Sequence, residues 1–378
     1  RSASLGVTGA LEDLNVILHI MPIDLYIKAT AASNASRLHS AGSWKDRPYG
    51  HSVLRKQLPP DLTRTSDYKL PSLSFENNVK ILFPSRKNWK KATTTKDYDI
   101  CVYTKGSKMD CGVGAGVFSE DVGINISIRL PDDASVFQAE ILAIKEAAAK
   151  LTALGCIGNI GIFVDSQAAL LAIASNRITS ILVEQCRRQL SELCRSSVTL
   201  VWVPGHSNYY GNERADELAR AGSALEVTHA IMVRPPLQYF KSGILLHYHN
   251  EAVARWENIN TCRIAKVIWP TYEYSKTKFL LSRNRSDLSN LTPVITGHWA
   301  KGTHATRLGL VFNSVCRSCK QPDKEETIEH FLCKCPALGH LRFRTLGHYI
   351  TEDFREMSSV SLYSLLLFIK NSYCSKNS

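Results

Sequence analysis

Apolar residues fall into short, regularly spaced runs between residues 97 and 222, the most readable part of the chain. Residues 99–104 alternate between apolar and polar side chains, and two further β-forming runs follow at residues 114–118 and 124–130. Such alternation is typical of a strand with one buried face. We expect these three runs to pair as a meander, with a turn over residues 106–112.

The second half of this stretch has the pattern of alternating helices and strands. Ser135 and Gln138 form a capping box, after which apolar residues recur at helical spacing to about residue 154. Two β-forming runs, at residues 160–164 and 198–203, are separated by helical segments, and a last helix is expected from about residue 212. The order predicts an α/β domain, a five-stranded mixed sheet with flanking helices.

The flanking segments are less regular. Residues 49–95 contain several prolines and end in a basic run, residues 86–91, which is suited to phosphate contact but is also compatible with a solvated connector. The expected segments are a helical segment (1–48), a basic linker (49–95), the α/β domain (96–225), a connecting helical region (226–295), a cysteine-rich segment (296–345) and a tail (346–378).

Composition narrows the class of partner. The 378 residues carry a formal net charge of +12, which favours a polyanion, nucleic acid before membrane. The longest apolar run, residues 362–369, is far shorter than the ~20 residues that a helix needs to cross a bilayer. Of the 11 cysteines, four lie between Cys316 and Cys335, which indicates reduced thiols and a metal site, not a disulfide framework. Because the chain starts at Arg1, we expect a fragment or a processed piece.

Three carboxylates lie in or at the ends of the expected elements. Glu140 follows the capping box, Asp165 comes directly after the strand at residues 160–164, and Asp216 lies in the last helix, while His206 lies in a glycine-flanked loop. Such element ends can converge at one edge of a sheet, which is how a site for two divalent metal ions is usually built. Each acid also has an ordinary explanation, as a solvated helix face, a helix cap or a first-turn acid.

Four blocks in this stretch resemble the signature blocks of type 1 ribonuclease H, namely residues 103–107, 138–140, 164–166 and 205–219. The flanks resemble parts of insect non-LTR retrotransposon polyproteins. Residues 10–28 resemble the segment that follows the reverse transcriptase, and residues 296–309 and 316–336 resemble the C-terminal end. The paired-aspartate motif of the reverse transcriptase is absent from the sequence, so no polymerase activity is expected.

The resemblance implies a hydrolase, an endonuclease that cleaves RNA in RNA–DNA hybrids with two Mg²⁺ or Mn²⁺ ions. It implies Glu140, Asp165 and Asp216 as metal ligands, and His206 as an aid to proton transfer or product release. In the family a fourth carboxylate, an aspartate, bridges both metals. This chain has Lys105 at that position, which places a positive charge where two dications are expected.

A second metal site is expected near the C-terminus. Cys316, Cys319, His330 and Cys335 have the ligand types and outer spacings of a tetrahedral zinc site, with Cys333 as a competing fourth ligand. The middle spacer is longer than in retroviral zinc knuckles. The alternative is a set of reduced thiols in a small core.

The sequence is compatible with three interpretations. The first is a retrotransposon-derived ribonuclease H whose activity Lys105 impairs. The second is a catalytically inactive nucleic-acid-binding module of the same fold, and the third is a decayed copy that is never made as protein. The partners implied are RNA–DNA hybrid, RNA or DNA, and the missing reverse transcriptase part of the same polyprotein. The sequence does not separate a nuclear from a cytoplasmic location.

Overall fold

The computed structural model describes residues 11–44, 47–75, 79–84, 97–193, 195–205, 209–299, 302–309 and 312–374. The chain divides into two compact units, one made of Arg1–Lys28 with Leu246–Ser378 and one made of Ala29–Leu245. The basic run at residues 86–91 and His206 lie outside the described residues. What the sequence predicts for them therefore stays a prediction.

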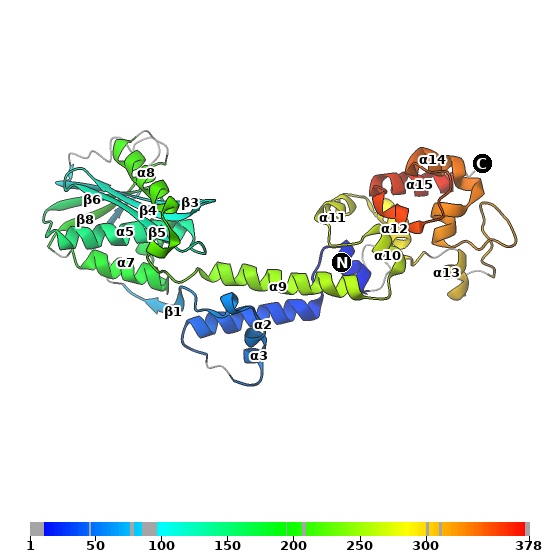
Figure 1. The fold of residues 1–378 in the computed structure, drawn as a ribbon, viewed down its shortest axis with the longest axis horizontal. Coiled ribbons are helices and arrows are strands. Elements are labelled where there is room, and N and C mark those ends of the chain that lie inside the picture. Colours follow the sequence, from blue (N-terminus) through cyan, green and yellow to red (C-terminus); the bar gives the residue numbers. More distant parts are fainter. Residues whose placement is uncertain are drawn as a thin grey trace. The chain divides into compact units, whose positions relative to one another are not determined.

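A six-stranded mixed sheet forms the centre of the unit Ala29–Leu245 (Figure 1). Its order is β2-β8-β6-β3-β4-β5, in which β3, β4 and β5 are antiparallel neighbours and β2, β8, β6 and β3 run parallel. The strands are β2 (Lys80–Leu82), β3 (Ile100–Met109), β4 (Gly112–Ser119), β5 (Ile124–Leu130), β6 (Asn159–Val164) and β8 (Ser197–Trp202). The predicted mixed α/β architecture is confirmed. The strand beyond the expected five is β2, from the segment for which the sequence predicts a linker.

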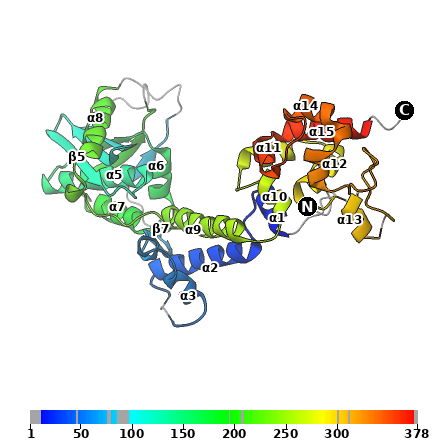
Figure 2. The same ribbon diagram turned by 45° about the vertical axis from the view of Figure 1, so that its right-hand side comes forward.

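Helices cover both faces of this sheet (Figures 1 and 2). α5 (Val136–Ala153), α6 (Gln167–Ala174) and α7 (Ile181–Ser191) share one apolar core with the sheet, and α8 (Tyr210–Ala224) packs on a second cluster. The pleat explains the division, because neighbouring residues of a strand face opposite sides. On β3, Val102 belongs to the core of α5 and Tyr103 to the cluster of α8.

α5 begins where the sequence predicts it to begin. The Ser135 side chain accepts a hydrogen bond from the Gln138 backbone N–H, and the Gln138 side chain accepts one from the Ser135 N–H, so the capping box is present. Ile141, Leu142 and Ile144 are fully buried on this helix. Each such side chain contributes roughly 1.5–3 kcal/mol by its burial. Cap and core together fix the position of the helix against β3.

The turn predicted over residues 106–112 was wrong. β3 continues to Met109 and pairs with β4 along its whole second half, as far as the pair Met109–Gly112. Only Asp110 and Cys111 form the turn. Ser107 and Lys108 pair with β4, so the ladder, and not a turn, satisfies their backbone groups. Lys105 therefore lies inside a strand and not at its end.

The same unit contains a smaller two-stranded sheet. β1 (Tyr68–Leu73) pairs antiparallel with β7 (Arg177–Ser180), which directly precedes α7. The carboxylate of Asp67 accepts hydrogen bonds from the Ser180 hydroxyl at 2.5 Å and the Leu182 N–H at 2.9 Å. Asp67 thereby ties β1 to the first turn of α7. The remaining elements are α3 (His51–Lys56) and the 3₁₀ turns Pro60–Thr63 and Val227–His229.

The other unit is helical. α1 (Leu11–Ile17) packs in one apolar core with the C-terminal helices, in agreement with the expected helical N-terminal region. α2 (Ile23–Ser40) and α9 (Leu237–Asn258) each contribute residues to both units. The other helices are α10 (Arg263–Ile268), α11 (Tyr274–Leu281), α12 (Arg285–Thr296), α13 (Gly302–Arg307), α14 (Gly339–Leu346) and α15 (Leu362–Cys374), with short turns at His330–Lys334, Pro336–Leu338 and Phe354–Ser359. Within the described part of the chain, no helix has the length and apolarity needed to span a membrane.

Candidate active site and candidate metal centre

Lys105 and Asp165 lie side by side on neighbouring strands. β3 and β6 run parallel, and their last paired residues are Thr104 and Val164, so the next residue of each chain segment reaches the same edge. The Lys105 ammonium donates a hydrogen bond to Asp165 Oδ2. The side chains of Lys105 and Asp165 are 17% and 8% exposed, so this ion pair is largely shielded from water.

Glu140 reaches the same point from α5. Its Oε1 atom lies 3.9 Å from Lys105 Nζ, and its residue is buried. Gly106, directly after Lys105, makes this approach possible, because a Cβ atom there would lie 2.7 Å from the Glu140 backbone nitrogen. Any larger residue at position 106 would push α5 away from β3. The other carboxylate oxygen, Oε2, is buried and has no hydrogen-bond partner among the described residues.

Asp216 belongs to the same cluster through α8. That helix lies directly on β4, where a Cβ atom on Gly116 would come within 2.2 Å of the Ala215 carbonyl oxygen. Gly116 pairs with Lys105 across β3 and β4, so the contact brings the helix beside the site. Asp216 forms an ion pair with Arg220, one helical turn away, with 2.6 Å between Oδ2 and Nη2. Its charge still raises the pKa values of both Lys105 and Glu140.

The cluster shifts the pKa values of its members strongly. Burial, and next the Asp165 charge, raise the pKa of Glu140 to about 8. Lys105 lowers this pKa, but by less. Burial alone would lower the pKa of Lys105, but the hydrogen bond to Asp165 and the surrounding carboxylates hold this pKa above its ordinary value. Lys105 is therefore a cation at neutral pH, while Glu140 mostly keeps its proton. Asp165 is the main partner of the ammonium.

These residues do not fit a pair of divalent metal ions as they stand. Metal ions need the carboxylate oxygens as ligands, and the Lys105 ammonium already pairs with one oxygen of Asp165 and faces one oxygen of Glu140. A dication at the same point would also be repelled by the ammonium in a shielded site. Glu140 and Asp165 both face the Lys105 ammonium, and the charge of Asp216 acts on Lys105 and Glu140. The lysine holds the place that the metals would need.

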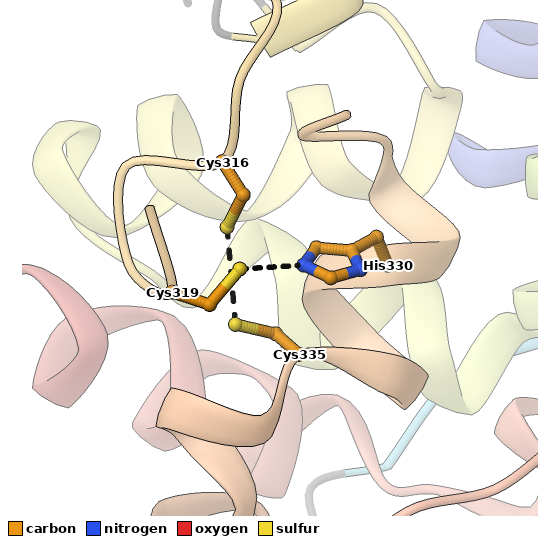
Figure 3. A group of neighbouring side chains, drawn as sticks. All are labelled: Cys316, Cys319, His330 and Cys335. Carbon is orange, nitrogen blue, oxygen red and sulfur yellow. Dashed lines mark hydrogen bonds between the residues drawn. The ribbon is translucent and has the colours of Figure 1, made fainter. Parts of the chain in front are cut away.

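A second cluster lies in the helical unit. The ligand atoms of Cys316, Cys319, His330 and Cys335 all lie within 4.8 Å of one another and point toward a common centre (Figure 3). The Sγ atoms of Cys316 and Cys335 are 3.8 Å apart, and Cys319 Sγ is 3.5 Å from His330 Nε2. Ligands ~2.0–2.3 Å from a tetrahedral zinc ion are roughly 3.3–3.8 Å from each other. The spacing of these two pairs thus matches a zinc site.

The local backbone decides which cysteine takes the fourth position. His330–Lys334 forms a single π-helical turn, which the Cys335 N–H closes by donating to the His330 carbonyl at 2.7 Å. This turn carries His330 and Cys335 to the same side. Cys333 is fully buried in the apolar core and lies outside the group, and burial raises the pKa of its thiol to about 12. The geometry selects Cys335 over Cys333.

The chemistry of this donor set fits zinc. Three thiols and an imidazole are the ligands of closed structural zinc sites. Burial, and then the adjacent Cys316 sulfur, raise the pKa of Cys335 to about 12. Without a bound cation the thiols therefore keep their protons, and several thiolates can lie this close together only around a metal ion. Burial and the Arg342 charge lower the pKa of His330, which favours the neutral imidazole that binds metal.

Comparison with known proteins identifies the central domain. Residues 97–224 match the family model RNase H. The RNase H domain thus covers β3 to α8 and contains Lys105, Glu140, Asp165 and Asp216. A curated protein named Ribonuclease H, from Jannaschia sp. (strain CCS1), is 60% identical over 30 residues, which is 8% of this chain. The matched stretch spans 19% of the length of that relative.

Sequence reasoning missed two basic residues at these sites. Arg220 pairs with Asp216. The sequence could have predicted this pair, because residues four apart on a helix are neighbours. Arg342 lies beside the cysteine cluster and donates to the carbonyl oxygen of Cys335 at 2.9 Å. Nothing in the local sequence singles out Arg342, since its burial depends on the packing of α14.

Proposed function

We propose that residues 97–224 act on RNA–DNA hybrids as a ribonuclease H domain, and that Lys105 suppresses metal-dependent cleavage in this chain. The family match and the convergence of Glu140, Asp165 and Asp216 support the first part. A single observation carries the second part, the pairing of the Lys105 ammonium with Asp165. Because Mg²⁺ or Mn²⁺ would have to displace this ammonium, occupancy of the metal site should be low.

The residues of this chain suit binding better than cleavage. An ammonium held by Asp165 neutralises part of the negative cluster and lowers its repulsion toward the phosphates of a nucleic acid. The net charge of +12 acts in the same direction. The second candidate is therefore an inactive module of the same fold that holds hybrid, RNA or DNA, and the ion pair at Lys105 favours it specifically.

The cysteine cluster supplies a second part of the proposal. Zn²⁺ bound by Cys316, Cys319, His330 and Cys335 would tie the segment 316–319 to the π-helical turn that begins at His330. We assign this zinc a structural role, because four protein ligands leave no open position for a substrate. The apolar core around Cys316 and Cys335 supports the same role.

The proposed origin rests on the flanking sequences. Residues 10–28, 296–309 and 316–336 resemble the segments that border the ribonuclease H domain in insect non-LTR retrotransposon polyproteins. On this proposal the chain works beside the reverse transcriptase part of the same polyprotein. That partner produces the RNA–DNA hybrid on which the domain acts.

The test is the cleavage of an end-labelled RNA–DNA hybrid in Mg²⁺ or Mn²⁺. The chain as it stands should cleave weakly or not at all, and Lys105→Asp should restore cleavage at least in part, because it supplies a fourth carboxylate and removes the cation. Lys105→Ala is the matched control, since it removes the cation without adding a ligand. Asp165→Asn in the Lys105→Asp background is the blank.

Metal occupancy can be followed without activity. Mg²⁺ should raise the melting temperature of Lys105→Asp and leave that of the unchanged chain unaffected, since only a bound ligand stabilises the folded state. Full cleavage by the unchanged chain that disappears in Asp165→Asn would overturn the suppressive role of Lys105. Absence of cleavage by Lys105→Asp, despite hybrid binding and a Mg²⁺-dependent melting temperature, would favour the inactive module.

A further inference from the structure

Arg342 is a fully buried cation beside the cysteine cluster. It lies in α14, and its guanidinium donates to the carbonyl oxygens of Cys335 at 2.9 Å, Phe331 at 3.4 Å and Tyr349. Its Nε atom is buried and has no acceptor among the described residues. The side chain is therefore held in one position directly behind a proposed zinc ligand.

Two carboxylates on the segment that carries His330 are paired with cations other than Arg342. Glu326 accepts two hydrogen bonds from Arg317, at 2.7 and 3.1 Å, and Glu329 pairs with Lys334 at 3.0 Å. In the part of the chain that the structure describes, the acceptors of the Arg342 hydrogen bonds are all backbone carbonyl groups, and none is a carboxylate. A buried cation without a counter-charge is strongly destabilising.

The carbonyl oxygens offset only part of this cost. The carbonyl oxygens of Phe331 and Cys335 carry partial negative charge, which favours a cation beside them. A dipole, however, supplies a fraction of a charge and not a whole one. The other charge must come from a group that the apolar surroundings bring close to the guanidinium.

We propose that the zinc-loaded Cys₃His centre is the counter-charge of Arg342. Zn²⁺ held by three thiolates and a neutral imidazole keeps one unit of negative charge, in a core that shields it from water. Arg342 is a positioning residue of this centre: it neutralises the excess charge and holds the backbone of Cys335 by its hydrogen bond. This assignment rests on the proposed zinc site.

An ordinary structural role has a different signature. If Arg342 only cross-links three carbonyl groups, its loss damages the fold to the same extent whatever the charge of the centre. If Arg342 is the counter-charge, replacing it weakens zinc binding when the centre is anionic and has little effect on zinc binding when the centre is neutral. Changing one thiolate ligand separates the two roles. Cys319 is suited to this change because it is the most exposed of the three cysteines in the cluster.

The experiment is a double-mutant cycle on zinc affinity in the full chain, measured by competition with a chromophoric chelator. Arg342→Met removes the charge and keeps a long apolar stem, and Arg342→Lys keeps the charge. Cys319→His makes the centre neutral, and Cys319→Ala, with water as fourth ligand, is a second neutral background. Circular dichroism of each variant checks that the helical unit is folded.

Arg342→Met should weaken zinc binding about tenfold or more in the native centre. The reason is that the core screens the attraction between the guanidinium and the anionic centre only weakly. In either neutral background the same substitution should change affinity less than about threefold, and Arg342→Lys should keep most of the native affinity. Equal losses in all backgrounds would overturn the proposal and leave Arg342 a carbonyl cross-link. If the native chain bound no zinc, the zinc site itself would fail, which is a separate outcome.

Discussion

Lys105 and Asp165 form a shielded ion pair although 60 positions separate them in the sequence. The pair depends on the parallel register of β3 and β6, which places the residues after Thr104 and Val164 at one edge. In the RNase H domain this edge also receives Glu140 and Asp216, and a cation supplied by the chain itself stands among the three carboxylates. The proposed suppression of cleavage by Lys105 rests on this arrangement.

The zinc site makes a prediction that separates two neighbouring cysteines. The purified chain should contain one zinc ion, Cys335→Ala should lose most of it, and Cys333→Ala should keep it. The reason is that Cys335 belongs to the group of ligand atoms, whereas Cys333 is packed in the apolar core. Metal analysis by mass spectrometry after dialysis measures this. Zinc retained by Cys335→Ala and lost by Cys333→Ala would show that the ligand assignment is wrong.

Glu140 should titrate far above the usual range of a glutamate. Its pKa is raised from 4.5 to about 8, first by burial and then by Asp165, so its carboxyl group is protonated at neutral pH. Lys105→Met should raise this pKa further, because Lys105 acts to lower it. Carbon-13 NMR of labelled glutamate carboxyl groups in magnesium-free buffer measures the titration, with Glu140→Gln to assign the signal. A midpoint near 4.5 would contradict the buried environment.

The same shift predicts how stability depends on pH. A raised folded pKa means that the folded state holds the proton more tightly than the unfolded chain does. The stabilisation due to Glu140 is complete below about pH 4.5 and is lost as the pH rises through about 8, by at most about 1.4 kcal/mol for each pH unit. Glu140→Gln should therefore gain stability relative to the unchanged chain between pH 5 and pH 8. Urea unfolding at both pH values tests this, and equal differences would contradict it.

Hybrid binding should fall steeply with salt, because lysine and arginine contacts to phosphates release counterions. The basic run at residues 86–91 is predicted from the sequence to make such contacts. Replacing Lys90 and Lys91 by alanine should reduce the slope of log affinity against log salt by about 0.9 for each lost contact. Replacing Lys150 and Arg188, exposed on α5 and α7, removes the same charge and is the matched control. Equal effects of the two double variants would show that only net charge matters.

Local patterns in the sequence were enough for much of the fold. Alternation at residues 99–104 and the capping box at Ser135 depend on neighbours in the chain, so they predicted a strand and the start of a helix correctly. The same holds for the candidate sites, because the identities of Glu140, Asp165 and Asp216 and the spacing of the cysteines can be read directly. The resemblance to ribonuclease H also predicted that Lys105 takes the place of an acid.

Only the tertiary structure decided how these residues meet. The Lys105–Asp165 pair needs the register of β3 on β6, and the choice of Cys335 over Cys333 needs the π-helical turn after Glu329. β2 joins the sheet by pairing with β8, more than a hundred residues later in the chain. Arg342 gains its place only when α14 packs on the cysteine cluster. Periodicity and spacing report interactions along the chain, whereas register and burial follow from contacts between distant segments, which no local pattern encodes.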